Sequence, residues 1–401
     1  MKYQEKTSRS RLHEYTGIMT QAFGLKAEDT LRWTPQHAVR TLVREKSIAA
    51  GLIIFSGGQW FGGRCLVSGL VAGVAVAPEH RGSGAGRRLM RGMLEELHSQ
   101  RVPLSALYAS TSAFYRKLGY ALAGDYSRWD IPSSVLPTAA GNTLTPVKMD
   151  LSDSRTQDTV NRLYTGYAQR HDGMLDRPAV FWQRKLTPHE SKRHLYIVCT
   201  DPADPHTTAQ GYVLLIHERS DHRLEVADTA ASNAAAADAI LNLLAAHRSV
   251  TDRVRFAGPE NSPLLLRIPD HARITRCDSE RWLLRIVHPA AALEQRGYPS
   301  ISIRLRIQIT DSTLPQNSGE YLLQLDDGKA TVVAPDNSAR PADLAKDIPV
   351  ITATAEGLAA LFCSAHPGQL AAADLLGGNE AGLKAARLVF HGDTPCITDK
   401  F

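Results

Sequence analysis

The segment Val71–Met90 constrains this chain more than any other stretch, because it joins an apolar strand pattern to a glycine-rich loop and then a helix. The apolar run ends at Pro78, which has no N–H to continue a sheet ladder. The loop that follows contains Arg81-x-x-Gly84-x-Gly86. Glycines let backbone N–H groups approach an anion, and the start of a helix adds positive partial charge. The pattern therefore predicts a cradle for a pyrophosphate, to which Arg81, Arg87 and Arg88 add charge.

The spacing of this loop argues against two other phosphate-binding motifs. A dinucleotide fold requires G-x-G-x-x-G, whereas the glycines here follow the order Gly82-x-Gly84-x-Gly86. That fold also places an acidic residue at the end of the next strand, and Leu104–Ala109 carries no carboxylate. The Walker pattern is absent. A glycine turn that serves only the packing of the helix stays open as an alternative.

The first 130 residues alternate helix and strand patterns, which is typical of an α/β layer fold. The expected helices are Arg11–Phe23, Pro35–Arg44, Arg87–Gln100 and Ser112–Leu118. The expected strands are Ile48–Phe55, Gly63–Val76 and Leu104–Ala109, the first two separated by a turn at Ser56–Gly58. The clearest helix presents its apolar side chains on one face: Leu89, Met90, Met93, Leu94 and Leu97.

The rest of the chain indicates two further domains. A Pro/Ser/Gly-rich stretch, Pro132–Pro146, reads as a linker, and the order of elements then partly recurs up to Ala257. The last third changes to alternating strands followed by two apolar helices. We therefore expect three domains in the 401 residues, with boundaries at 1–135, 136–288 and 289–401.

Composition excludes several classes of protein. The net charge of +5 comes from 46 basic and 41 acidic residues spread along the chain, so no nucleic-acid partner is expected. Five scattered cysteines without a CxxC pair argue against a zinc ribbon or a disulfide framework, and no metal is expected. The N-terminal residues lack an apolar signal segment, and the longest apolar runs are too short or too glycine-rich for a bilayer. These features favour a cytoplasmic protein without membrane insertion.

The loop and a second motif resemble the GCN5-related N-acetyltransferases. Arg81–Gly86 matches that family's R/Q-x-x-G-x-G/A motif, and Ala113-Phe-Tyr-Arg-Lys-Leu-Gly-Tyr120 resembles its F-Y-x-x-L-G-F segment. The resemblance implies acetyl-CoA as the acetyl donor. Its pantetheine arm would pair with Val74, Ala75 and Val76, and its pyrophosphate would rest on the loop residues Gly82, Ser83, Gly84, Ala85, Gly86 and Arg87.

Acetyl transfer from a thioester needs a stabilised oxyanion and a proton for the leaving thiolate. The N–H of Val76 is the candidate for the oxyanion. Tyr115 lies where the family places its general acid, although a packing role is the alternative. Ser110 and Thr111 either cap the helix that follows or contact the cofactor. No base stands out from the residues themselves: Glu79 and His80 are expected to face solvent, and nothing fixes the positions of His13, Glu14, Glu28 and Asp29.

Over its whole length the chain is similar to the Eis (enhanced intracellular survival) family of acetyltransferases. The similarity is carried by Val74-Ala-Val-Ala-Pro-x-His-Arg, by Ala106-Leu-Tyr-Ala-Ser110 and by the terminal phenylalanine. It implies two tandem acetyltransferase folds followed by a sterol-carrier-like domain, homohexamers, and amine acceptors that include aminoglycosides and lysine side chains. It also implies that the carboxylate of Phe401 is the base, whereas chain ends in general are frayed and solvated. Lys400 places a positive charge beside the terminus, whereas a polycationic aminoglycoside would prefer an acidic surrounding.

The second domain lacks the means to bind the cofactor. Its corresponding turn, Ala227-Asp-Thr-Ala-Ala-Ser-Asn-Ala234, has neither glycine nor arginine, so one cofactor site per chain is expected. Two other functions are compatible with the domain order: a carrier that binds a lipid or sterol in its C-terminal third, and a scaffold with an inactive acetyltransferase site. The intact loop and Tyr115 argue against both as the main function.

Overall fold

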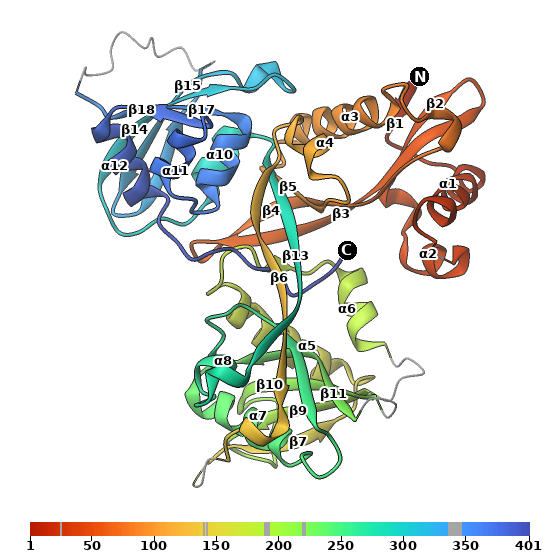
Figure 1. The fold of residues 1–401 in the computed structure, drawn as a ribbon, viewed down its shortest axis with the longest axis vertical. Coiled ribbons are helices and arrows are strands. Elements are labelled where there is room, and N and C mark those ends of the chain that lie inside the picture. Colours follow the sequence, from red (N-terminus) through yellow and green to blue (C-terminus); the bar gives the residue numbers. More distant parts are fainter. Residues whose placement is uncertain (25, 139–140, 142, 188–192, 219–221, 336–346) are drawn as a thin grey trace. The chain divides into compact units, whose positions relative to one another are not determined.

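The computed structural model describes residues 1–401 except 25, 139–140, 142, 188–192, 219–221 and 336–346 (Figure 1). The chain divides into two compact units. The first unit comprises Met1–Gly124, Arg281–Pro395 and Phe401, and the second comprises Asp125–Glu280 and Cys396–Lys400. No helix in the described ranges is long and apolar enough to cross a bilayer.

The first unit begins with a mixed sheet in the order β1-β2-β3-β4-β5-β13. These strands span Lys2–Gln4, Val39–Arg44, Ser47–Phe61, Arg64–Val76, Leu104–Tyr108 and Thr275–Ile286. Neighbours are antiparallel except β4 and β5, which are parallel because α3 connects them. The accompanying helices are α1 (Arg9–Phe23), α2 (Ala27–Trp33), α3 (Ala85–Ser99) and α4 (Ser112–Arg116).

Helix α3 packs on the sheet through the apolar face that the sequence predicts. Leu89, Met90, Met93, Leu94 and Leu97 are all buried, and they share one core cluster with residues of β2, β3, β4 and β5. On the same buried face, Glu96 accepts hydrogen bonds from Arg40 at 2.7–3.0 Å and from the Tyr3 hydroxyl at 2.6 Å, and so ties β1 and β2 to α3.

Two expectations for the first domain are wrong. Residues 35–44 do not form a helix: a short 3-10 turn, Gln36–Ala38, leads into strand β2, whose β-branched Val39, Thr41 and Val43 are buried. The turn between β3 and β4 lies at Gly62–Gly63 and not at Ser56–Gly58. Both of these glycines have positive φ, 58° and 76°, as a two-residue hairpin of type I′ requires.

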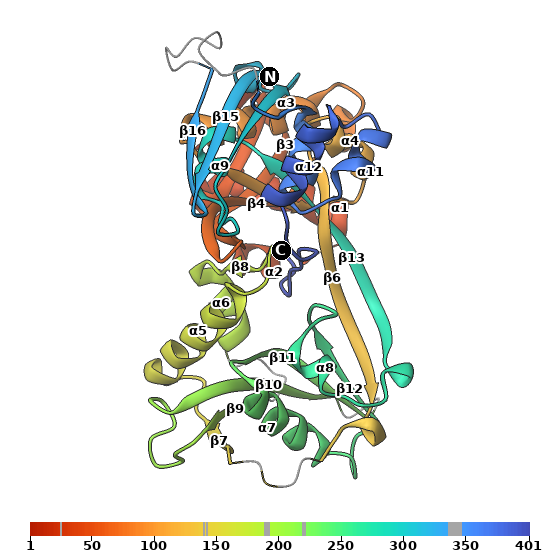
Figure 2. The same cartoon turned by 90° about the vertical axis from the view of Figure 1, so that its left-hand side faces the viewer.

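A second, separate sheet in the first unit has the order β16-β15-β14-β17-β18 (Figure 2). Its strands are Ile303–Thr310 (β14), Gly319–Asp326 (β15), Lys329–Val333 (β16), Val350–Thr354 (β17) and Leu376–Gly378 (β18). Three helices pack against β14, β17 and β18: Ala355–Phe362 (α10), Pro367–Ala372 (α11) and Glu380–Val389 (α12). Helix α9 (Pro289–Gln295) contacts β16.

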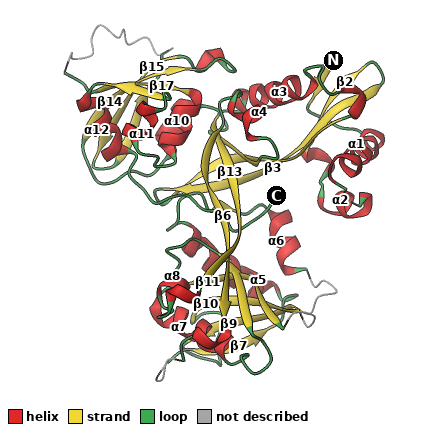
Figure 3. Cartoon of the chain, in the orientation of Figure 1, coloured by secondary structure: helices red, strands yellow, loops and turns green. Residues whose placement is uncertain are grey.

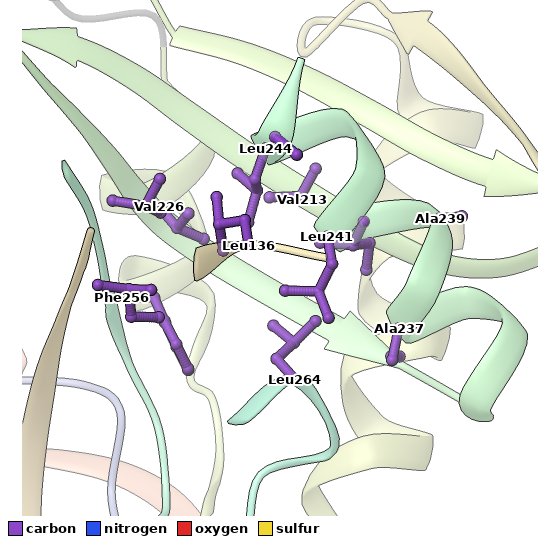
Figure 4. Packing of buried hydrophobic residues seen from close by; sticks show 14 of the residues in the cluster. Leu136, Val213, Val226, Ala237, Ala239, Leu241, Leu244, Phe256 and Leu264 are labelled. Atoms are coloured by element: carbon purple, nitrogen blue, oxygen red, sulfur yellow. The ribbon is translucent and has the colours of Figure 1, made fainter. Parts of the chain in front are cut away.

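The second unit also mixes strands and helices (Figure 3). Its sheet runs in the order β6-β12-β11-β10-β9-β7, with strands Ala121–Pro132, Arg253–Ala257, Arg223–Ala231, Ala209–Glu218, Arg193–Cys199 and Thr145–Met149. A further short strand is β8 (Leu175–Asp176), and the helices are α5 (Ser154–Ala168), α6 (Ala179–Leu186), α7 (Ala234–Ala245) and α8 (Pro263–Leu266). The alanine-rich α7 packs inside this unit, with Ala237, Leu241 and Leu244 in a core that includes Val213 and Phe256 (Figure 4).

Candidate active site

Strands β4 and β5 part from each other immediately before the glycine loop. Their parallel pairing runs from Ser68–Leu104 to Val71–Leu107 and ends there, while β4 continues to Val76. At the same point β4 holds an extra residue relative to β3, because Ala72 faces Ile53 but Ala75 faces Gly51. A bulge of this kind bends the strand and increases its twist.

The bulge depends on Gly73. Its φ is +59°, and a Cβ there would lie 2.7 Å from the hydroxyl of Tyr15 and from Met19. That hydroxyl donates a 2.5 Å hydrogen bond to the carbonyl of Gly73. Burial raises the pKa of Tyr15 well above its usual value, so the donor keeps its proton. Buried contacts of Gly73 with Tyr15 and Met19 therefore fix the bulge at which β4 and β5 part.

The N–H of Val76 points into the gap between the strands. The next residue, Ala77, donates its N–H to the carbonyl of Ala49 on the β3 side at 3.0 Å. Backbone N–H groups alternate sides along an extended strand, so the N–H of Val76 faces the opposite side, where β5 has turned away. Val74 and Val76 are half-buried and Ala75 is buried. The residues predicted to pair with pantetheine thus lie in the part of β4 that is not paired with β5.

The glycine loop is open to solvent in front of α3. Gly82 and Gly84 have φ of 75° and 80°, and a Cβ at either position would meet no atom within 4 Å. Gly84 is the N-cap of α3 and makes no side-chain cap, and the first-turn amides of a helix have no partner within it. A glycine required for close packing would have neighbours. Positive φ, and not close packing, therefore accounts for glycine at these two positions, and the binding of a pyrophosphate by the loop stays a prediction.

The charge around the loop is positive and uncompensated by salt bridges among the described residues. Arg81, Arg87 and Arg88 are all exposed. The Ser83 hydroxyl donates a 2.6 Å hydrogen bond to the carbonyl of His80, which fixes the loop from within. Ala85 is buried and anchors the start of the helix. Backbone amides, a helix N-terminus and guanidinium groups together suit a diphosphate.

Tyr115 lies on α4, directly after β5. Its side chain is buried, with 8% of the residue exposed. Its ring packs edge-on against the rings of Phe114 and Tyr120, with centroids 4.9 and 6.0 Å away. Burial raises the pKa of Tyr115 to about 12, so its hydroxyl stays protonated at physiological pH. Ser110 and Thr111 are exposed, and Thr111 makes no side-chain cap to α4 although it occupies the N-cap position. Capping is therefore not the role of Thr111.

The C-terminal third supports the helix of Tyr115, which the sequence did not indicate. The Nε of Arg116 on α4 donates a 2.6 Å hydrogen bond to Glu356 on α10. Gly119, with φ +82°, comes so close that a Cβ would lie 2.9 Å from the Cβ of Ala355 and from Arg285. Arg285 is itself buried and paired with Asp311. The contacts of Arg116 and Gly119 join segments that are more than 150 residues apart in the sequence, so a pattern over a few residues could not predict them.

The chain end is ordered by specific contacts. The ring of Phe401 is half-buried and packs edge-on against Tyr108, with centroids 5.3 Å apart. Lys400 contacts Asp278 at 3.2 Å and Glu280 at 3.0 Å, and lies 4.5 Å from the centroid of the Tyr126 ring. Two carboxylates therefore offset the charge of Lys400 that the sequence places beside the terminus.

Other candidate residues from the sequence have structural or solvent-facing positions. Glu14 accepts a 2.6 Å hydrogen bond from the N–H of Ile48, and Glu79 is exposed. Tyr120 is fully buried, with its hydroxyl 2.8 Å from that of Ser105. Among the residues that the structure describes, no group of histidine, cysteine, aspartate and glutamate has the arrangement of a metal site.

The equivalent helix of the second unit is closed to phosphate. Helix α7 is capped by Asn233, whose side chain accepts a 2.9 Å hydrogen bond from the N–H of Ala236. The turn before it has no glycine with positive φ. A side-chain cap occupies the position that an anion would take at α3. The geometry of the two helix starts agrees with a single cofactor loop per chain.

Replacing a glycine of the loop by alanine is expected to weaken cofactor binding, whereas the same replacement at a glycine outside the loop should not. In Gly84→Ala, the new methyl group enters the open space in front of α3 and the backbone is strained at φ +80°. We expect the Kd for coenzyme A to rise at least about tenfold, equivalent to about 1.4 kcal/mol, by isothermal titration calorimetry.

Gly24→Ala is the matched control for this substitution. Gly24 ends α1 in the same unit, has φ +67° and likewise meets no atom within 4 Å. Both variants should lose about 1–2 kcal/mol of stability from left-handed backbone strain. Only the loop variant should lose affinity, and equal Kd values for the two variants would contradict the assignment of the loop.

Comparison with known proteins agrees with these features. Two family models, each described as an acetyltransferase (GNAT) domain, match residues 5–123 and 173–286, and a sterol carrier protein domain matches residues 289–398. The chain is 27% identical over 352 residues to N-acetyltransferase Eis of Mycobacterium bovis and of Mycobacterium tuberculosis, an alignment that covers 81% of this chain and 78% of each relative.

Solved structures of the same kind superpose over the whole chain. A GCN5-related N-acetyltransferase from Anabaena variabilis has a TM-score of 0.90 at 29% identity, with 100% of both chains covered. One from Kribbella flavida has a TM-score of 0.85 at 25% identity, covering 100% of this chain and 98% of that chain. Eis1 from Mycobacterium abscessus, at 19% identity and a TM-score of 0.80 over 100% of both chains, has the same fold.

The parted strands, the open loop and these matches define an acetyltransferase of the GNAT class, with two GNAT domains and a C-terminal sterol-carrier-like domain. Within that class, the chain is similar to the N-acetyltransferases named Eis. Both the fold and the enzyme class expected from the sequence are confirmed. Enzymes of the GNAT class take their acetyl group from acetyl-CoA, the donor expected here.

Proposed function

We propose that this acetyltransferase modifies primary amines of a small-molecule or peptide acceptor, namely aminoglycosides at several positions, lysine side chains, or both. The observation that carries the proposal is the gap between β4 and β5 at the mouth of the Gly82–Arg87 loop. Pantetheine would extend along Val74, Ala75 and Val76, the pyrophosphate would rest on Gly82–Arg87 beside Arg81, and Ser110 and Thr111 would contact the cofactor from the far side of the gap.

The proposed reaction is direct attack of the amine on the thioester. The C–N bond forms, the thioester oxygen gains negative charge, and the N–H of Val76 stabilises that charge. The C–S bond then breaks, and Tyr115 gives its proton to the leaving sulfur. The proton that the amine loses passes to the carboxylate of Phe401. With an ordinary pKa of about 3.5, an α-carboxylate is a weak base, so it must be partly desolvated or act through water.

The raised pKa of Tyr115 predicts the alkaline side of the pH profile. A general acid is lost when it deprotonates, and burial raises the pKa of Tyr115 from 10.0 to about 12. We therefore expect kcat to fall less than about twofold between pH 8 and pH 10.5, where an ordinary tyrosine would be mostly ionised. The assay is thiol release corrected for spontaneous hydrolysis, with re-assay at pH 8 to exclude inactivation. A reversible fall with a midpoint near pH 10 would contradict this role.

A panel of acceptors tests the substrate proposal. Thiol release from acetyl-CoA is measured with kanamycin-type aminoglycosides, simple polyamines and lysine peptides, and the products are identified by mass spectrometry. Release that depends on an aminoglycoside and gives several acetylated amines would support the first acceptor class. Release with peptides alone would assign the second. If coenzyme A binds and no amine in the panel is acetylated, the proposed acceptor classes are wrong.

A carrier function is the second candidate, and the match of a sterol carrier protein domain to residues 289–398 favours it. Binding of a fluorescent fatty acid or sterol to the whole chain tests it. A carrier should bind the probe equally well in the Gly84→Ala variant, because residue 84 lies outside the matched domain. Absence of saturable binding would remove this candidate.

The domain boundaries 1–135, 136–288 and 289–401, the homohexamer and the cytoplasmic location also belong to the proposal. The family models matched at 5–123, 173–286 and 289–398 support the boundaries, the resemblance to the Eis family implies the hexamer, and the location rests on the scattered cysteines and the polar N-terminal residues. Light scattering should give six times the chain mass of 43.8 kDa, and a smaller assembly would contradict the hexamer.

A further inference from the structure

The segment that precedes Phe401 is fixed at consecutive positions to the second unit. The N–H of Cys396 donates to the carbonyl of Asp172 at 2.8 Å, and that of Ile397 donates to the carbonyl of Asp125 at 3.2 Å. Ile397 is only 1% exposed. Chain termini are ordinarily among the least ordered parts of a protein. A segment held in this way therefore needs an explanation.

The most unusual of these contacts is made by Asp399, whose side chain is almost completely buried. Its carboxylate accepts a 2.9 Å hydrogen bond from the Nε of Arg177 and lies 3.2 Å from the Nζ of Lys185. The guanidinium of Arg177 has no exposed surface, and its other edge binds both oxygens of Asp228 at 2.6 and 2.8 Å. It also stacks 3.6 Å from the centroid of the Tyr164 ring.

The charges of this cluster balance only when the tail is in place. Arg177 and Lys185 carry two positive charges, and Asp228 and Asp399 carry two negative ones. Burial alone would raise the pKa of Asp228, but Arg177 and Lys185 lower it to about 2, so it is ionised. Without Asp399, Arg177 and Lys185 would share the single carboxylate of Asp228, and the cluster would hold an excess positive charge largely removed from water, which is costly. The cluster therefore favours the state in which the tail carboxylate is bound.

The position of Asp399 connects this cluster with the chain end. Asp399 is two residues before Phe401, and Thr398, Asp399 and Lys400 line one side of a pocket of about 290 Å³ in the second unit. With Asp399 fixed, the terminal carboxylate can lie no further than about 7 Å along the chain from it, the span of two residues. A base must be held within hydrogen-bond reach of the proton that it accepts.

We propose that Arg177 and Lys185 form a clamp for Asp399, and that Asp399 is a positioning residue which presents the Phe401 carboxylate for catalysis. The second GNAT domain, whose helix start is closed to phosphate, thereby serves the reaction as the anchor of the tail. The catalytic part of this inference rests on the proposed role of Phe401. The clamp itself does not, and the two are tested separately.

Release of the terminal residue tests the clamp without reference to activity. Carboxypeptidase Y removes Phe401 only when the tail leaves its site, so the rate, followed by intact-protein mass, reports tail opening. We expect Asp399→Asn to release Phe401 at least about tenfold faster than the natural chain, a change of about 1.4 kcal/mol in the opening equilibrium. Asp399→Glu should restore part of the protection.

Asp130→Asn is the matched control. Asp130 is also a buried carboxylate of the second unit between two arginines, 2.6 Å from Arg253 and 3.4 Å from Arg255, but it does not touch the tail. This variant should release Phe401 at the natural rate. Equal rates for Asp399→Asn and the natural chain would overturn the clamp. If Asp399→Asn does not fold, Lys185→Met weakens the same clamp and replaces it in the experiment.

Kinetics test the positioning role. In Asp399→Asn we expect kcat to fall about tenfold, while the Kd for acetyl-CoA changes less than twofold, and we expect Asp399→Glu to recover part of kcat. A second variant, with one glycine added after Phe401, moves the terminal carboxylate itself. If that variant is inactive but Asp399→Asn releases Phe401 fast with unchanged kcat, the positioning role is overturned. If that relocation also leaves kcat unchanged, the proposed base is what fails, and the release assay still decides the clamp.

Discussion

Replacing Tyr115 by phenylalanine is expected to lower kcat by about 10²- to 10⁴-fold, the usual contribution of a positioned general acid. The hydroxyl is the atom that would protonate the leaving thiolate, and burial keeps it protonated by raising the pKa of Tyr115 to about 12. The ring, which packs against Phe114 and Tyr120, is retained in the variant. The Kd for acetyl-CoA should therefore change less than about twofold. Stopped-flow thiol release and calorimetry give the two values.

Tyr120→Phe is the control for this substitution. It removes a hydroxyl from a neighbouring buried tyrosine, which here lies 2.8 Å from the hydroxyl of Ser105. The loss of one buried hydrogen bond should cost about 1 kcal/mol of stability and leave kcat within about threefold. If Tyr115→Phe and Tyr120→Phe have the same kcat, Tyr115 is a packing residue and the acid must be sought elsewhere.

Moving the terminal carboxylate is expected to have the second large effect. One glycine added after Phe401 shifts the carboxylate by about 3.5 Å and keeps the aromatic ring that packs on Tyr108. We expect kcat at pH 7 to fall at least about 100-fold, because a base out of reach of the amine proton contributes nothing. The loss should shrink above about pH 10, where an amine acceptor of lysine type is already deprotonated.

Phe401→Leu separates the carboxylate from the ring. This variant keeps the terminal carboxylate in place and loses the edge-on contact with Tyr108, so kcat should stay within about fivefold of the natural value. Full activity of the glycine-extended chain at pH 7 would show that the terminal carboxylate is not the base. Glu79 and His80 would then be the next residues to replace.

The conformation of the glycine loop was the part of the candidate site that could be predicted from the sequence. Its requirements are local: glycine where φ is positive, and a helix that starts directly behind it. Gly82 and Gly84 meet both conditions, at φ of 75° and 80° in front of α3. Tyr115 could also be located, because the helix of its motif follows β5 within a few residues.

The errors came where long-range pairing decides the structure. Residues 39–44 can satisfy either a helical or an extended pattern, and pairing with β1 and β3 makes them a strand. Gly57 and Gly58 suggest a turn, but antiparallel pairing with β4 continues the strand through them to Phe61. Neither pairing is encoded in a short window of sequence.

The sequence by itself determined the α/β class, the apolar face of α3 and the glycine loop in front of that helix, because each follows from backbone conformation or periodicity over a few residues. Only the tertiary structure decided where β4 and β5 part after Val71 and which residues of α10 contact the segment around Tyr115. It also decided where the C-terminal residues are bound. Arg177 and Asp399 are 222 residues apart, and each alone reads as an ordinary surface charge. Their burial is stable only because folding brings opposite charges together, which no local pattern can report.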